Sequence, residues 1–177
     1  TVTRTPDGDL TETWWQDPTT TSWHPVEFPV KTAEDISRFA WCYRDVTVSA
    51  DADAIEAQRR RVEQIGQRGI VKTGFGPTPL MHLVEHVIGP VNVHYLLADC
   101  PGEMDELIEA MHEVGLACMR EIAAATPADL VVSTENTSTT LISPSQFDRY
   151  CLRHLRQRGE VIEAAGKMHE LHMCGHT

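Results

Sequence analysis

Three short strand-like segments, separated by loops and helical stretches, constrain the fold of this chain more than any other feature of its sequence. They cover residues 70–75, 129–135 and 167–174. Stretches with apolar residues at helical spacing lie between them, over residues 80–88, 91–98, 101–125 and 143–165. Strands that alternate with loops and helices in this order are typical of parallel sheets built from βα units. We therefore expect an α/β fold in which the three strands are adjacent and parallel, with helices on their outer face.

The first 30 residues have a different pattern, and we treat them as a separate N-terminal segment of β-hairpin and irregular structure. Residues 3–5 and 10–13 flank the turn-forming run Pro6–Asp9, which predicts the hairpin. We expect the three tryptophans that follow, at positions 14, 15 and 23, to pack the hairpin against the rest of the chain. Residues 31–177 form the second region, which begins with predicted helices over 32–41 and 53–66.

The charge and composition of the chain exclude several classes of partner. The formal net charge is -11, whereas binding to phosphates requires a surplus of Lys and Arg, so we expect no nucleic-acid partner. The basic clusters at 59–61 and 153–158 are interpreted as solvated helix faces. No apolar run approaches the ~20 residues that span a bilayer. Five widely spaced cysteines suggest no disulfide framework and favour a cytoplasmic location, with Cys118 and Cys151 as inert core thiols.

The third strand carries the strongest candidate for chemistry. Side chains alternate across a strand, so His172 and Cys174 share one face with Met168 and Glu170, while His169, Leu171 and Met173 share the face expected to meet the helices. An imidazole nitrogen and a thiolate one strand repeat apart can both bind zinc, at ~2.0–2.3 Å. Gly175 follows and allows the backbone to approach closely. The alternative is a buried thiol beside a hydrogen-bonded histidine, and the spacing alone leaves both open.

The second strand ends in a polar run that is typical of a functional rim. We expect Leu130 and Val132 to face outward, which leaves Glu135 directed inward with Val131 and Ser133. Glu135 is then a candidate third zinc ligand or acid/base group, the alternative being a solvated loop carboxylate. Asn136 is a second catalytic candidate, and Thr137 a candidate for substrate binding.

The first strand leads into a rigid loop of glycine and proline, residues 74–79, of the kind that shapes pockets. Phe75 in this loop and His82 just after it are candidates for substrate binding. His82 and His86 lie one helical turn apart, which could bind a metal, although surface or core histidines are commoner at this spacing.

Together these segments resemble the uroporphyrinogen decarboxylase superfamily over roughly residues 28 to 177. The matching segments are Gly74–Pro77, Ala128–Val132, Leu141–Phe147, Gly166–Lys167 and His172–Gly175. The resemblance implies a (β/α)8 (TIM) barrel, of which this chain would be the middle portion. Three strands do not close a barrel of ~250 residues, so we expect a fragment that associates with itself or with missing chain.

Within that superfamily, the sequence His172-Met173-Cys174-Gly175 matches the motif of the zinc-dependent methylcorrinoid:thiol methyltransferases. That likeness implies zinc as cofactor, a corrinoid or corrinoid protein as methyl donor, and a small thiol as acceptor. The branch also carries a late cysteine that has no counterpart here. Two alternatives remain: a tetrapyrrole decarboxylase that uses no metal, or an inactive barrel fragment.

Overall fold

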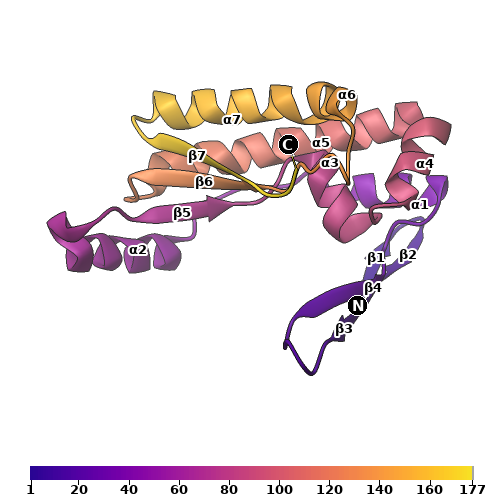
Figure 1. Ribbon diagram of the computed structural model, residues 1–177, viewed down its shortest axis with the longest axis horizontal. Helices are drawn as coiled ribbons and strands as arrows, with labels where there is room; N and C mark the ends of the chain where they lie inside the picture. Colours follow the sequence, from indigo (N-terminus) through magenta and orange to yellow (C-terminus); the bar gives the residue numbers. More distant parts are fainter. Residues whose placement is uncertain (177) are drawn as a thin grey trace. The chain divides into compact units, whose positions relative to one another are not determined.

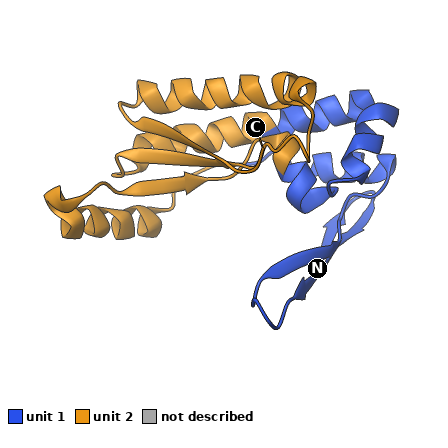
Figure 2. Cartoon of the chain, viewed as in Figure 1, with its two compact units in different colours: residues 1–46, 82–111 blue, residues 47–81, 112–177 orange. Residues whose placement is uncertain are grey.

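The computed structural model describes residues 1–176 and divides the chain into two compact units (Figure 2). Unit 1 comprises residues 1–46 and 82–111, and unit 2 comprises residues 47–81 together with the chain from residue 112. The expected N-terminal segment, residues 1–30, lies wholly within unit 1. The long helix α5 (Pro101–Ala125), which the sequence predicts with the same bounds, contributes residues to both units.

Unit 1 begins with two antiparallel hairpins. The predicted one pairs β1 (Val2–Thr5) with β2 (Gly8–Thr11), and it packs against helix α1 (Ala33–Trp41). A second hairpin, which the sequence analysis did not foresee, pairs β3 (Thr13–Gln16) with β4 (Trp23–Glu27).

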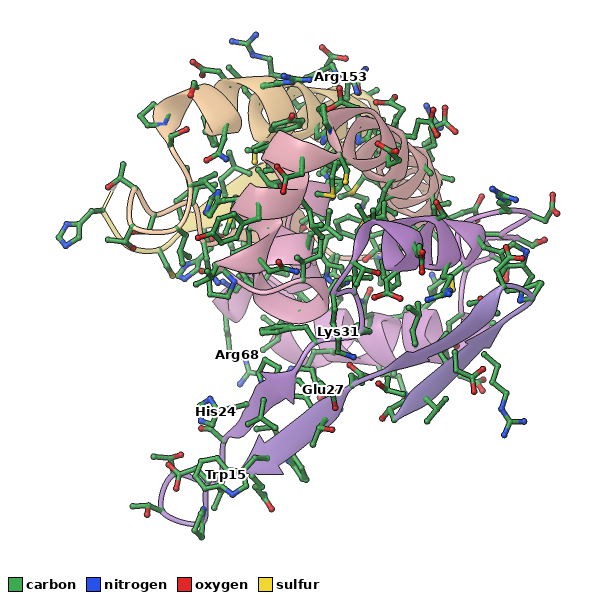
Figure 3. All side chains as sticks on the ribbon, turned by 90° about the vertical axis from the view of Figure 1, so that its right-hand side faces the viewer. Trp15, His24, Glu27, Lys31, Arg68 and Arg153 are labelled. Atoms are coloured by element: carbon green, nitrogen blue, oxygen red, sulfur yellow. The ribbon has the colours of Figure 1, made fainter. Side chains whose placement is uncertain are left out.

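The tryptophans of this second hairpin do not behave as expected. Trp15 and Trp23 are 51% and 60% exposed, so the expectation that they pack against the rest of the chain is wrong. Trp15 instead pairs with His24 across the hairpin, and Figure 3 shows both rings on the β3–β4 ribbon. Trp14 stacks on His86 within unit 1, with ring centroids 6.3 Å apart. A two-stranded ribbon has little core of its own, which explains why its large side chains stay in solvent.

The remaining elements of unit 1 are helical. Thr32 caps α1 through a capping box with Asp35, as the acidic first turn predicts. Helix α3 (Pro79–His82) spans the boundary of the two units and continues into a π-helical turn, η2 (Leu83–Val87), which is followed by α4 (Asn92–Asp99). Gly89 separates η2 from α4 with a φ of 92°, and a Cβ there would lie 2.6 Å from the ring of Phe28.

Unit 2 contains the predicted parallel sheet. Its strands are β5 (Lys72–Phe75), β6 (Leu130–Glu135) and β7 (Met168–Met173), adjacent in that order and parallel, which confirms the expected arrangement. Helix α2 (Ala52–Ile65) and the short η1 (Gly66–Arg68) precede the sheet. A continuous helical stretch connects β6 to β7: α6 (Pro144–Phe147), η3 (Asp148–Leu152) and α7 (Arg153–Ala164).

One face of this sheet packs against α5 and α7, which lie along it in Figure 1. The centre of the contact is formed by Met119 of α5, Val131 of β6 and Ile162 of α7, all fully buried, with Phe75 and Val161 beside them. Burial of each such side chain contributes about 1.5–3 kcal/mol. The described residues therefore form a mixed α/β structure with a three-stranded parallel sheet, and within residues 1–176 this sheet does not close into a barrel.

In the described part of the chain, none of the helices has both the length and the apolar character that crossing a membrane requires.

Candidate functional site

The His172–Cys174 pair lies on the sheet face opposite the helices. The register pairs His169 with Val131 of the core, so His169 faces the helices, and alternation places His172 and Cys174 on the other face. Both side chains are exposed, and His172 Nε2 lies 3.0 Å from Cys174 Sγ. The predicted shared face of these two residues is thus confirmed, and they meet at the carboxyl end of β7.

Strand β6 is oriented opposite to the expectation. Val131 packs among α5 and α7, so Ser133 and Glu135 share its helix-facing side. Glu135 is fully buried there, and it lies on the other face of the sheet from His172. The expectation of an inward Glu135 is therefore wrong, because residues 130–133 are all buried and apolar periodicity cannot tell the two faces of such a strand apart.

The buried carboxylate of Glu135 is held by the loop that follows β5. Thr78 donates to it twice, from its backbone N–H at 2.8 Å and from Oγ1 at 2.6 Å. Cys151 Sγ lies 3.3 Å from the same hydroxyl oxygen. Burial raises the pKa of the Cys151 thiol to about 12, although Thr78 opposes the shift, so this cysteine is the inert core thiol that the sequence predicts.

Arg158 holds the same loop from helix α7. It donates to the carbonyl oxygens of Gly76 and Pro77, at 3.0 and 2.9 Å, and its guanidinium lies 4.6 Å above the centre of the Phe75 ring. Burial lowers the pKa of Arg158, and the charge of Glu135 opposes that shift. The interpretation of residues 153–158 as a solvated face is wrong for Arg158, which is 3% exposed. Phe75 therefore contributes to packing of the loop as well as being a candidate for substrate binding.

His169 also faces the helices. Its Nε2 lies 2.9 Å from Ser133 Oγ, and burial lowers its pKa. A Cβ on Gly159 of α7 would lie 3.3 Å from the His169 ring, so this glycine leaves room for an imidazole among apolar neighbours. The contact with Ser133 and the space left by Gly159 explain how His169, a polar residue, occupies a helix-facing position.

The loop after β6 contacts the chain that follows Cys174. Thr139 donates to the carbonyl of His176 from its backbone N–H, at 2.8 Å, and Ser138 Oγ accepts from the His176 N–H at 3.3 Å. Gly175 has a φ of 94°, and a Cβ there would lie 2.6 Å from Ser138, so the expected close approach at this glycine is present.

The other predicted site residues are dispersed. Asn136 is half-buried at the start of the loop after β6, and Thr137 is buried beside a hollow that Met173 of β7 and Phe147 of α6 also line. His82 belongs to unit 1, where its ring centroid is 5.3 Å from that of His86 and burial lowers its pKa. The catalytic roles of Glu135 and Asn136 stay predictions. The same holds for the roles of Thr137 and His82 in substrate binding.

Sequence reasoning missed Thr78 and Arg158 as the residues that hold the loop Gly76–Thr78. Thr78 looks like an ordinary loop threonine, and only its pairing with Glu135, 57 positions away, distinguishes it. A weak signal for Arg158 is its helical phase, because it lies on the same face of α7 as the buried Leu155 and Ile162.

Comparison with models of known protein families and with curated proteins finds no match for this sequence. The resemblance to the uroporphyrinogen decarboxylase superfamily therefore stays a prediction that rests on the sequence motifs alone.

Proposed function

We propose that this chain is part of a zinc-dependent methyltransferase of the uroporphyrinogen decarboxylase superfamily, which moves a methyl group from a corrinoid to a small thiol. In this proposal the three parallel strands belong to a (β/α)8 barrel. The observation that carries it is the 3.0 Å contact between His172 Nε2 and Cys174 Sγ at the exposed carboxyl end of β7. Active sites of such barrels lie at that end of the strands.

The donor atoms of the pair fit zinc. A tetrahedral zinc ion with ordinary bond lengths holds a sulfur and an imidazole nitrogen about 3.5 Å apart. The present separation would have to increase by about half an ångström, which two exposed side chains can accommodate by small rotations. Among residues 1–176, no cluster of three or more His, Cys, Asp and Glu side chains can hold a metal ion. The pair therefore supplies two ligands, and further positions belong to another ligand, water or the substrate thiol.

The chemistry proposed for the site begins with thiol activation. His172 and Cys174 would hold the zinc ion, and such an ion would supply a lower pKa for a coordinated acceptor thiol, which would then be present as a thiolate near neutral pH. His172 and Cys174 would hold this thiolate at the carboxyl end of the strands, where a large methyl donor could reach it. The thiolate sulfur then attacks the methyl carbon of the donor. In this reaction a sulfur–carbon bond would form as the donor's bond to the methyl group breaks, and the electron pair of the broken bond would leave with the donor.

Zinc content separates this function from its alternatives. The protein is produced with supplementary zinc as wild type, His172→Ala, Cys174→Ser and the matched control Cys118→Ser. We expect zinc in the wild type and the control, and at least a tenfold loss of zinc affinity in the other two. Methyl transfer from methylcobalamin to 2-mercaptoethanol should follow the zinc content. A wild type without zinc, or equal zinc in wild type and Cys174→Ser, would contradict the proposal and favour the metal-free decarboxylase.

A further inference from the structure

The backbone that directly follows strand β7 is held by hydrogen bonds from β6 and from the loop after it. The Cys174 N–H donates to the carbonyl of Glu135 at 3.1 Å, which extends the parallel ladder by one residue. The His176 carbonyl accepts from the Thr139 N–H at 2.8 Å and from Thr139 Oγ1 at 3.1 Å. The His176 N–H donates to Ser138 Oγ at 3.3 Å. Ser138 and Thr139 therefore form a clamp on the chain beyond Cys174.

Gly175 turns the chain back toward this clamp. Its φ is 94°, a conformation that glycine adopts readily and other residues rarely do. A Cβ at Gly175 would lie 2.6 Å from Ser138 Cβ and 2.7 Å from Ser138 Oγ, so only a residue without a side chain allows this approach. Cys174 therefore lies between two points of attachment, the Glu135 carbonyl on one side and the clamp on the other.

The clamp belongs to an ordered loop. Ser138 is 7% exposed, and its carbonyl accepts from the N–H groups of Leu141 and Ile142, at 2.8 and 3.0 Å. Its Oγ also accepts from the Thr140 N–H at 3.3 Å. By contrast, residues 174–176 are exposed, so side-chain packing contributes little to their position. Hydrogen bonds to the clamp and to β6 thus determine where the backbone of Cys174 lies.

We propose that Ser138 and Thr139 are positioning residues, which hold the Cys174 thiol beside His172 before a metal ion binds. The thiol follows its own backbone, and its Sγ lies 3.0 Å from His172 Nε2. Ordering of a flexible segment opposes binding, so a segment that is already ordered binds its ligand more tightly. The role of the clamp toward zinc rests on the proposed function, whereas the order of residues 174–176 in the metal-free protein does not.

The metal-free chain tests the clamp itself. Backbone ¹⁵N relaxation gives the order parameters of Cys174 and His176, which should be close to the ~0.85 of rigid backbone in the wild type. They should fall below ~0.6 in Gly175→Ala, because the added Cβ collides with Ser138. Gly166→Ala is the matched control, since φ there is also positive, at 73°, and a Cβ would meet no atom within 4 Å. Wild-type values below ~0.6, or equal values in the two variants, would overturn the inference.

Metal affinity tests the consequence for the site, with Co²⁺ in place of zinc and the thiolate-to-cobalt absorption as the signal. Loss of backbone order at one residue corresponds to about tenfold in affinity, so Gly175→Ala should bind Co²⁺ about tenfold more weakly than Gly166→Ala. Ser138→Ala should also bind more weakly than Ser145→Ala, which removes a hydroxyl that contacts Ser143 Oγ instead. Urea unfolding midpoints should agree between each variant and its control, because residues 174–176 are exposed.

The two measurements separate this inference from the proposed function. Residues 174–176 that are ordered by the clamp, in a wild type that binds neither Co²⁺ nor Zn²⁺, contradict only the proposed function. Metal binding through His172 and Cys174 with equal affinity in Gly175→Ala and Gly166→Ala contradicts only this inference.

Discussion

At the scale of single residues, the unusual feature of unit 2 is the number of polar side chains in its helix-facing core. His112 of α5 and His154 of α7 are 3% and 2% exposed, and their rings stack with centroids 3.9 Å apart. Arg153 Nη2 lies 3.1 Å from His154 Nε2, and His112 Nε2 lies 2.5 Å from Gln157 Oε1. The Arg153 guanidinium can donate to His154 Nε2 only when that nitrogen carries no proton. The packing of α5 on α7 therefore requires the His154 imidazole to stay uncharged.

This requirement predicts a loss of stability in mild acid. Burial, and then the charges of His112, Arg153 and Arg158, lower the pKa of His154 to about 3. Above pH 6.5 both the folded and the unfolded chain hold a neutral imidazole, so His154 contributes no pH dependence. Between pH 6.5 and 3 only the unfolded chain binds the proton, so the free energy of unfolding falls by up to about 1.4 kcal/mol per pH unit.

Urea unfolding at pH 7.5 and pH 5.0 measures the effect. The wild type should lose about 2 kcal/mol more than His154→Phe between these two pH values. An equal loss in both proteins would show that His154 does not control the acid response.

The Thr78–Glu135 contact predicts a second residue-scale effect. Thr78→Val removes the hydroxyl that donates to Glu135 at 2.6 Å, while the backbone N–H contact remains. A hydrogen bond to a buried charged group contributes about 1.5–3 kcal/mol, so unfolding should become easier by that amount. The matched change Thr134→Val, at an exposed position of the neighbouring strand, should stay within about 0.5 kcal/mol of wild type. Equal stabilities of the two variants in urea would contradict the assigned contact.

At the scale of elements, the sequence predicted the strands and long helices well because their apolar periods are strong. The direction of the β6 side chains was not predictable, since residues 130–133 are buried on both faces. For β7 the alternation assigned the faces correctly, since His172 and Cys174 are exposed on one face while His169 is half-buried on the other. It did not predict burial, because Leu171 and Met173 on the helix-facing side are 41% and 39% exposed and the helices do not cover them as expected. The polar loop contacts were also beyond sequence reasoning, since Thr78, Glu135 and Arg158 meet only after the helices have packed.

The start of the helical stretch after β6 gives an element-scale prediction. Ser143 Oγ accepts from the Gln146 N–H, and the Gln146 side chain accepts from the Ser143 N–H at 2.9 Å. Ser143→Ala should therefore lower the free energy of unfolding by about 1 kcal/mol. Ser145→Ala removes only the 3.0 Å contact of its hydroxyl with Ser143 Oγ and leaves the capping box in place, so its effect should be smaller. Thermal unfolding of the two variants compares them, and a smaller effect of Ser143→Ala than of Ser145→Ala would contradict the cap.

At the scale of the whole molecule, the order of βα units followed from the sequence, but the division into two compact units did not. The second hairpin was missed because its strands are short and polar between the tryptophans. In the described residues, β5 and β7 are edge strands of the sheet, and Met168 on β7 is 54% exposed. Unpaired edges and exposed apolar side chains favour association between chains.

We therefore expect this chain to associate with itself. Sedimentation velocity at micromolar concentrations should show species larger than the monomer, and Met168→Lys should shift the distribution toward the monomer. A folded wild-type chain that sediments as a monomer at every concentration would refute this expectation.

The central claim, that His172 and Cys174 bind zinc together, is tested most directly by X-ray absorption at the zinc edge on the zinc-loaded protein. The account predicts a sulfur scatterer at ~2.3 Å and an imidazole nitrogen at ~2.0 Å, with the sulfur contribution lost in Cys174→Ser. A wild-type spectrum that contains only oxygen and nitrogen neighbours, and that does not change in Cys174→Ser, would contradict it.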